Sequence, residues 1–137
     1  MGLLVDGVWR DRWYDTKSTD GRFVRTTTSF RESLSGDVGA PFPAVAGRYH
    51  LVVSLACPWA HRTLIVRKLK GLESAIGVVV VDPLMLEHGW EFTTANPDHL
   101  GGRRFFYEFY LESAPKYSGR VTVPVLWDQE SGRIVNN

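Results

Sequence analysis

The chain has 137 residues, of which 44% are hydrophobic and 23% charged, and its formal net charge is +1. This composition is typical of a globular protein, and the length suffices for one domain with a buried core. A net charge so close to zero gives no electrostatic reason to expect nucleic acid or a membrane surface as a partner. A single cysteine allows no internal disulfide, and the sequence predicts neither a signal peptide nor a bilayer-spanning run, so we expect a cytoplasmic protein.

The first 47 residues show little hydrophobic periodicity but are rich in aromatic side chains. These aromatic residues are Trp9, Trp13, Tyr14, Phe23, Phe30 and Phe42. Because disordered tails are usually poor in aromatics, we expect residues 1–47 to be an extension that lies on the surface of a folded domain, residues 48–137. Within the extension, residues 29–33 ("SFRES") predict a short helix, with Ser29 as its cap and Glu32 at the third position.

Residues 49–81 have the pattern of one β-α-β unit. Residues 49–55 ("YHLVVSL") are typical of a buried strand. Residues 59–70 predict a helix, with Pro58 in its first turn and Gly71 as its stop. Residues 76–81 ("IGVVVV") form a continuous apolar run, as in a parallel strand that is covered on both faces.

The rest of the chain predicts a loop, a second helix and a β-hairpin. Residues 83–100 are loop-like, and residues 103–113 can form a helix. Residues 121–128 and 133–135 read as paired strands. Pro124 would remove a ladder hydrogen bond, and a cis bond before it would reconcile it with the strand pattern. The predicted order is β-α-β-α-β-β, an α/β class, with the closing helix expected next absent.

The only cysteine, Cys57, lies at the turn of the β-α-β unit. Ligands of open α/β sheets bind at this end of the strands. Unpaired N–H groups and a partial positive charge at a helix amino terminus favour the thiolate, which is the nucleophilic form of cysteine. The alternative is a buried and inert cysteine. Pro58 and the strand-to-helix location favour a nucleophile over that alternative.

Ala60 indicates which chemistry the thiol can perform. Residues 57–60 ("CPWA") have the frame of a C-x-x-C redox motif, with Ala60 where the second cysteine would stand. A mixed disulfide on Cys57 therefore cannot be released from within the helix and needs an external thiol. Glutathione is the abundant cytoplasmic candidate, so the residues predict thiol exchange through a Cys57–glutathione mixed disulfide.

Other polar and aromatic groups are less specific. His61 is expected on the helix surface rather than in catalysis, and Trp59 is expected either in the core or in a pocket wall. Arg62, Arg103 and Arg104 are most simply solvated charges. The sequence shows no metal-ligand spacing, so we expect no metal, and no glycine pattern of a phosphate loop.

Several motifs together carry a resemblance to a known family. They are "YHLVVSLACPWAHRTLIVRKLKGLE", "GWEF", "GRVTVPVLWD", "IVNN" and, in the extension, "FVRTTTSFRE". They closely resemble the glutathionyl-hydroquinone reductases, the xi class of the glutathione transferase superfamily, over nearly the whole chain. The resemblance implies a thioredoxin-like amino-terminal domain that is followed by an all-helical domain.

The resemblance also implies an activity and a set of site residues. Family members remove glutathione from glutathionyl-hydroquinones: a cysteine attacks the conjugate sulfur, hydroquinone leaves, and a second glutathione frees the cysteine as oxidised glutathione. By position, Cys57 would be the nucleophile and Trp90 would line the glutathione site. Val123, before a cis Pro124, would pair its backbone with the cysteinyl part of glutathione. Arg120 is a weaker candidate for contacting a glutathione carboxylate.

The sequence departs from the family pattern after "IVNN". In the family a Glu-Ser pair that holds the γ-glutamyl group follows, and then the helical domain with the substrate pocket and dimer contacts. We therefore expect a truncated, incomplete thioredoxin-like domain, whose turnover alone is less supported, and a homodimer only for a full-length form. Two alternatives stay open: an omega-like thioltransferase or dehydroascorbate reductase, and a non-catalytic module that binds glutathione.

Overall fold

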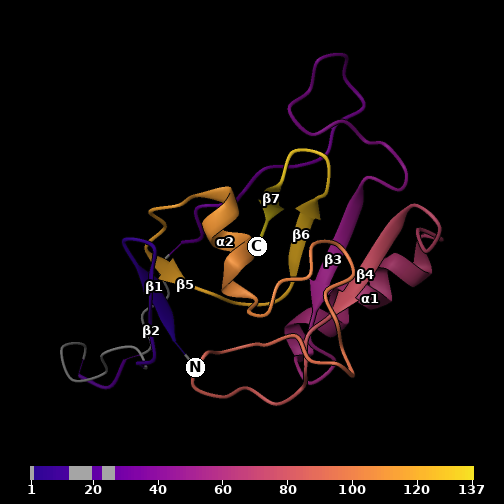
Figure 1. Cartoon of the computed structure of the whole chain (residues 1–137). Helices are drawn as coiled ribbons and strands as arrows, with labels where there is room; N and C mark the ends of the chain where they lie inside the picture. Colours follow the sequence, from indigo (N-terminus) through magenta and orange to yellow (C-terminus); the bar gives the residue numbers. More distant parts are fainter. Residues whose placement is uncertain (1, 13–19, 23–26) are drawn as a thin grey trace.

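The computed structural model describes residues 2–12, 20–22 and 27–137 (Figure 1). Within these residues the chain forms two helices and seven strands, divided between two sheets. In chain order they are β1 (Leu3–Val5), β2 (Val8–Arg10), β3 (Tyr49–Val53), α1 (Pro58–Leu69), β4 (Ile76–Val80), α2 (Tyr107–Ser113), β5 (Gly119–Arg120), β6 (Val125–Asp128) and β7 (Arg133–Asn136).

The larger sheet has the order β4-β3-β6-β7. Strands β3 and β4 are parallel and joined by α1, which confirms the predicted β-α-β unit. Strand β6 pairs antiparallel with both β3 and β7, which confirms the hairpin. With α2 between β4 and β6, the main body has the predicted β-α-β-α-β-β order. This arrangement places the carboxyl end of β3 and the start of β6 at the same edge of the sheet, beside Cys57.

The core between these elements is strongly aromatic. Phe106, Phe109, Tyr110 and Trp127 are all essentially inaccessible to solvent. Phe109 meets Trp127 edge-to-face, with 4.7 Å between the ring centroids. Each such side chain contributes about 1.5–3 kcal/mol through burial, so α2 is held to the sheet mainly by its apolar face.

Two predicted elements begin later than the sequence pattern indicated. The second helix starts at Tyr107 and not at residue 103, because the chain before it pairs with another loop: Phe92 N–H donates to Arg104 O at 2.8 Å. The strand predicted over 121–128 begins only at Val125. The Val123–Pro124 bond is cis, as predicted. Proline has no N–H for a ladder, which is consistent with the strand starting after it.

The predicted helix over residues 29–33 was wrong. Arg31 instead forms a bridge with Asn136 at the edge of β7, and Glu32 N–H donates to Val135 O at 3.0 Å. A capping pattern competes here with a sheet edge whose backbone groups need partners. The edge wins, and the segment is extended.

The amino-terminal extension is joined to the folded body by a small second sheet. Strands β1 and β2 form a hairpin, and β1 pairs antiparallel with β5, giving the order β2-β1-β5. Leu4 is completely buried in the main core. Figure 1 shows the indigo hairpin beside β5. The expectation that the extension lies on the folded domain is met by this hairpin; Trp13, Tyr14 and Phe23 lie outside the described residues, and the domain boundary at residue 47 stays a prediction.

Candidate functional site

Cys57 occupies the position before the first residue of α1. Its backbone is extended, with φ −100° and ψ 115°, and its side chain makes no capping hydrogen bond. A tight turn leads into it, because Cys57 N–H donates to Ser54 O at 3.1 Å. The His61 N–H donates to Cys57 O at 3.0 Å, which is the first hydrogen bond of the helix. The half-buried thiol is thus held at the amino terminus of α1.

The loop before β6 brings Val123 to this thiol. The Cys57 Sγ lies 3.9 Å from Val123 O, and the Val123 side chain is buried. Cys57 and the Val123–Pro124 pair are 66 residues apart in the chain and meet here as the sequence predicted. This juxtaposition puts a main-chain segment directly beside the sulfur of Cys57.

Two side chains hold the Val123 segment in place. Tyr110 Oη donates to Thr122 O at 2.9 Å and accepts from Thr122 N–H at 3.2 Å. Asn137 Nδ2 donates to Thr122 O at 2.8 Å and to Pro124 O at 3.1 Å. Burial raises the pKa of Tyr110 far above its ordinary value, so the hydroxyl stays neutral and can serve as both donor and acceptor.

The sequence reasoning missed both of these supporting residues. Asn137 had a signal, because it ends the quoted "IVNN" motif, where an asparagine amide can bridge two carbonyls. Tyr110 had none, since a tyrosine in a helix pattern reads as a core residue until its hydroxyl partner is known.

Trp90 lies on the loop that follows β4. Its carbonyl accepts the Phe106 N–H at 2.9 Å, and the next residue, Glu91, accepts the Asp82 N–H through its carbonyl, also at 2.9 Å. The partly buried indole packs against the hydrophobic core that Cys57 also contacts. Trp90 therefore belongs to a loop that is tied down on both sides.

Arg120 belongs to β5, in the other sheet, and precedes Val123 by three residues in the chain. It pairs with Leu3 as part of β5, and its carbonyl accepts the Tyr117 hydroxyl at 3.0 Å. The structure thus brings Cys57 and Val123–Pro124 together, next to the ends of β3 and β6, but places Arg120 in a strand of the other sheet.

One expectation about a side chain is reduced to a single alternative, and another is corrected. Trp59 is not a core residue, because 55% of its surface is exposed, which leaves the pocket-wall alternative. Arg103 is not a solvated charge: it forms ion pairs with Asp98 at 2.8 Å and Glu112 at 2.6 Å and lies over the Phe109 ring. Its guanidinium plane can stack on an aromatic face while its N–H groups bind carboxylates, which the sequence alone does not reveal.

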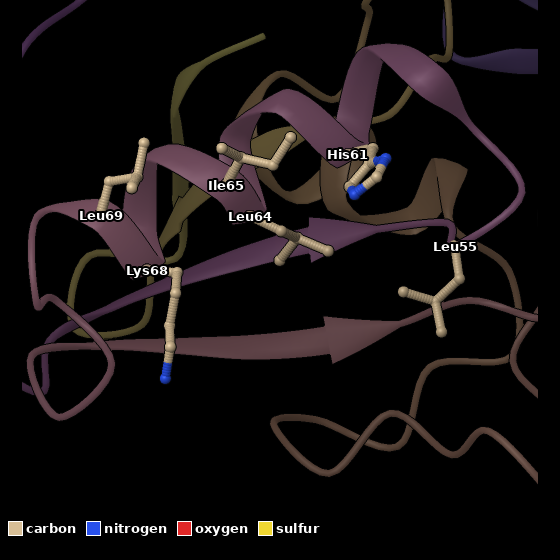
Figure 2. A pocket seen from close by; sticks show the side chains of 6 residues that line it. All are labelled: Leu55, His61, Leu64, Ile65, Lys68 and Leu69. Carbon is tan, nitrogen blue, oxygen red and sulfur yellow. The ribbon is translucent and has the colours of Figure 1, made fainter.

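An apolar hollow runs along the outer side of α1 (Figure 2). Its lining residues are Leu55, His61, Leu64, Ile65, Lys68 and Leu69. Leu55 is 69% exposed and Leu69 80% exposed. Leu55 lies just before α1 and Leu69 is its last residue, so the hollow has an exposed apolar side chain near each end of the helix.

The described part of the chain contains no group of three or more His, Cys, Asp or Glu side chains that could hold a metal ion. Among the same residues, neither helix has the length and apolar character needed to cross a bilayer.

The model of the glutathione S-transferase N-terminal domain matches residues 56–137. The chain belongs to this family. The match begins beside Cys57 and includes Trp90, Val123 and Asn137, so the transferase domain contains the whole of the site described above.

Individual relatives show which class of glutathione transferase the chain resembles. Glutathionyl-hydroquinone reductase YqjG of Escherichia coli is 58% identical over 148 residues, covering 100% of this chain and 45% of the relative. A xi-class transferase from Natrialba magadii superimposes with a TM-score of 0.86 at 48% identity, over 100% of this chain and 41% of the other. The glutathione-bound structure of E. coli YqjG gives a TM-score of 0.80 at 47% identity, over 99% and 42%.

These matches confirm the resemblance to the xi class and to the thioredoxin-like amino-terminal part of its members. The chain spans less than half the length of the relatives that it matches. A protein named for another class is also similar: the glutathione S-transferase omega-like 2 of Schizosaccharomyces pombe is 50% identical over 126 residues, covering 90% of this chain and 40% of the relative.

Proposed function

We propose that this chain is the glutathione-handling part of a glutathionyl-hydroquinone reductase. The carrying observation is the single thiol at the start of α1, 3.9 Å from Val123 O. The Cys57 thiolate attacks the sulfur of the conjugate, and the bond between that sulfur and the ring carbon breaks. The ring carbon takes up a proton, and the hydroquinone leaves. A second glutathione then attacks the Cys57–glutathione disulfide, releases oxidised glutathione and restores the thiolate.

The site residues receive the following roles in this proposal. Val123 pairs its backbone with the cysteinyl part of glutathione, and Pro124 shapes the loop that presents it. Trp90 lines the glutathione site. The short distance between Val123 and the thiol supports the role of Val123. The hydrogen bonds that fix the loop of Trp90 support the role of Trp90. Arg120 has less support as a carboxylate contact, since it lies in the other sheet.

The whole protein's partners follow from the same proposal. Glutathione and a glutathionylated quinol are the substrates, the reaction takes place in the cytoplasm, and a homodimer forms in a full-length form. The exposed apolar face of α1 supports packing against the helical domain that the family implies, which would supply the quinol pocket. The net charge of +1 supports neither nucleic acid nor a membrane as a partner.

The omega-like alternative uses the same cysteine and has less support, because the xi-class match extends over the whole chain. Substrate comparison separates the two. A glutathionyl-hydroquinone is preferred under the proposal, whereas glutathionylated hydroxyethanethiol is preferred under the alternative.

The first prediction concerns a single turnover, which needs only the attack by Cys57. Mixing the chain with a glutathionyl-hydroquinone releases one equivalent of hydroquinone and leaves one glutathionyl group on the protein. Cys57→Ser does neither, because a serine hydroxyl is a far weaker nucleophile toward sulfur. Chromatography of the product and the intact protein mass check both points.

The control is the variant His61→Ala, which lies on the same helix and keeps the thiol; it behaves as the parent. Hydroquinone release by Cys57→Ser at the parent rate would contradict the proposal. Glutathione binding without hydroquinone release or mixed disulfide would assign the chain as a non-catalytic module.

A further inference from the structure

Trp9, on strand β2 of the amino-terminal hairpin, contacts the turn that immediately precedes Trp90. Its Nε1–H donates to Glu87 O at 2.9 Å. Its ring also covers Gly89, where an added Cβ would lie 2.8 Å from Cη2 of the indole. Gly89 has a φ of +77°, so both the backbone conformation and the indole exclude a side chain at this position.

The other contacts of Trp9 lead back to the same turn. Its ring stacks on Tyr107, the first residue of α2, at 5.0 Å between centroids. Tyr107 stacks on Phe105 at 5.2 Å, and Phe105 stacks on His88 at 4.7 Å. His88 lies between Glu87 and Gly89. The four rings and the turn therefore form a closed circuit of contacts, which holds the turn from two sides.

Trp90 directly follows the turn that this circuit holds, and its backbone is fixed by hydrogen bonds. The turn itself is closed by mutual backbone hydrogen bonds between Leu86 and Gly89. The next carbonyl, that of Trp90, accepts the Phe106 N–H at 2.9 Å. The hairpin that carries Trp9 is anchored in turn by the pairing of β1 with β5 and by buried Leu4. A rigid support thus reaches from the extension to the backbone of Trp90.

We propose that Trp9 is a positioning residue for glutathione binding: it fixes the 86–89 turn so that Trp90 is preorganised in the glutathione site. The inference rests on the proposed function, because it takes Trp90 as a glutathione contact. It assigns the amino-terminal hairpin a part in the site. A binding group that is already ordered loses less entropy on binding, so the loss of Trp9 weakens affinity without changing the chemistry at Cys57.

The experiment measures the rate at which Cys57 in the 137-residue chain forms a mixed disulfide, as a function of oxidised glutathione concentration. Trp9→Ala raises the half-saturating concentration roughly tenfold and leaves the limiting rate unchanged. Trp9→Phe keeps a ring for stacking but lacks the N–H, and gives a smaller rise, about threefold. Val8→Ala, an exposed neighbour on the same strand, is the matched control and changes neither parameter.

Hydrogen exchange supplies a readout that a general loss of stability would not produce. Exchange becomes faster at residues 86–90 in Trp9→Ala and stays as in the parent elsewhere. Where Trp9→Ala does not fold by circular dichroism, the Trp9→Phe variant carries the test. An unchanged half-saturating concentration in a folded Trp9 variant would overturn the proposal.

Variants of Trp90 separate this inference from the proposed function. Trp90→Ala raises the half-saturating concentration, and adding Trp9→Ala to it causes no further rise, because the positioned side chain is already gone. If the two effects multiply instead, Trp9 acts on another part of the chain and the inference is wrong. If Trp90→Ala has no effect, the glutathione role of Trp90 itself fails, and the inference fails with it, while the role of Cys57 is judged by the single-turnover assay.

Discussion

At the scale of single residues, the site depends on groups that do not react. Cys57 meets Val123 on a segment that Asn137 holds in place, with one amide that donates to the carbonyls on both sides of Val123. Tyr110 adds a second pair of hydrogen bonds at Thr122. A cysteine at the start of a helix requires only local structure, whereas the Val123 segment beside it is positioned by tertiary contacts.

Asn137→Ala is therefore expected to weaken glutathione binding by about three- to tenfold, because each lost hydrogen bond contributes about 0.5–1.5 kcal/mol to the geometry of the loop. Calorimetric titration with glutathione checks this. Asn136→Ala is a close control, since the Asn136 amide donates instead to Glu32 O at 3.0 Å, away from the site. Equal effects of the two variants would show that Asn137 does not position the Val123 segment.

At the scale of elements, an ion pair joins the start of β3 to the end of β6. Arg48 contacts Asp128 at 2.6 Å, and Asp128 also accepts from Ser131 and from the Glu130 N–H in the β6–β7 turn. Burial alone would raise the pKa of Asp128, but the hydrogen bonds from Arg48, Ser131 and Glu130 outweigh it and hold that pKa below its ordinary value. One carboxylate thus secures the register of two neighbouring strand pairs.

Because the folded pKa of Asp128 is depressed, its contribution to stability is present above the unfolded pKa, near 3.9, and is lost as the pH falls through the folded value. Asp128→Asn is expected to lower the free energy of unfolding by about 2 kcal/mol at pH 7, and by progressively less below about pH 4. Urea unfolding across this range measures it. Glu130→Gln removes the exposed partner of Arg48 and should cost under about 1 kcal/mol. If the difference in unfolding free energy between the parent and Asp128→Asn stayed constant with pH, the depressed pKa of Asp128 would be contradicted.

At the scale of the whole molecule, the described chain has an ordered core on one side of α1 and an apolar surface on the other. Only Ala60 is fully buried among the residues of α1. Trp59, Val66 and Leu69 are more than half exposed. Figure 2 shows Leu64, Ile65 and Leu69 of this helix among the side chains that line the hollow.

This surface is expected to bind the dye ANS, which fluoresces on exposed apolar patches. Leu69→Lys should reduce the fluorescence by about half, since it places a charge within the hollow. Val38→Lys changes a fully exposed valine on the separate loop before β3 and should leave the fluorescence unchanged. This variant controls for the effect of an added positive charge outside the hollow. Equal loss of fluorescence in both variants would show that the dye does not bind at α1.

Local patterns in the sequence sufficed wherever short-range chemistry decides the structure. The apolar run of β4, Pro58 at the helix start and the lone thiol of Cys57 are readable one after another, because propensity, capping and nucleophilicity depend on neighbours in the chain. Pro124 within a strand pattern likewise indicated a bend beside the site, and the structure places it there.

Only the tertiary structure decided what depends on partners far along the chain. Residues 29–33 carry a helix-capping pattern, yet they lie extended along β7, because a strand edge offers hydrogen bonds that the short helix would forgo. Arg103 looks like a surface charge until Asp98, Glu112 and Phe109 surround it. The contact of Trp9 with Glu87 spans 78 residues. No local pattern encodes such pairs, because their free energy arises only when the fold has brought both members together.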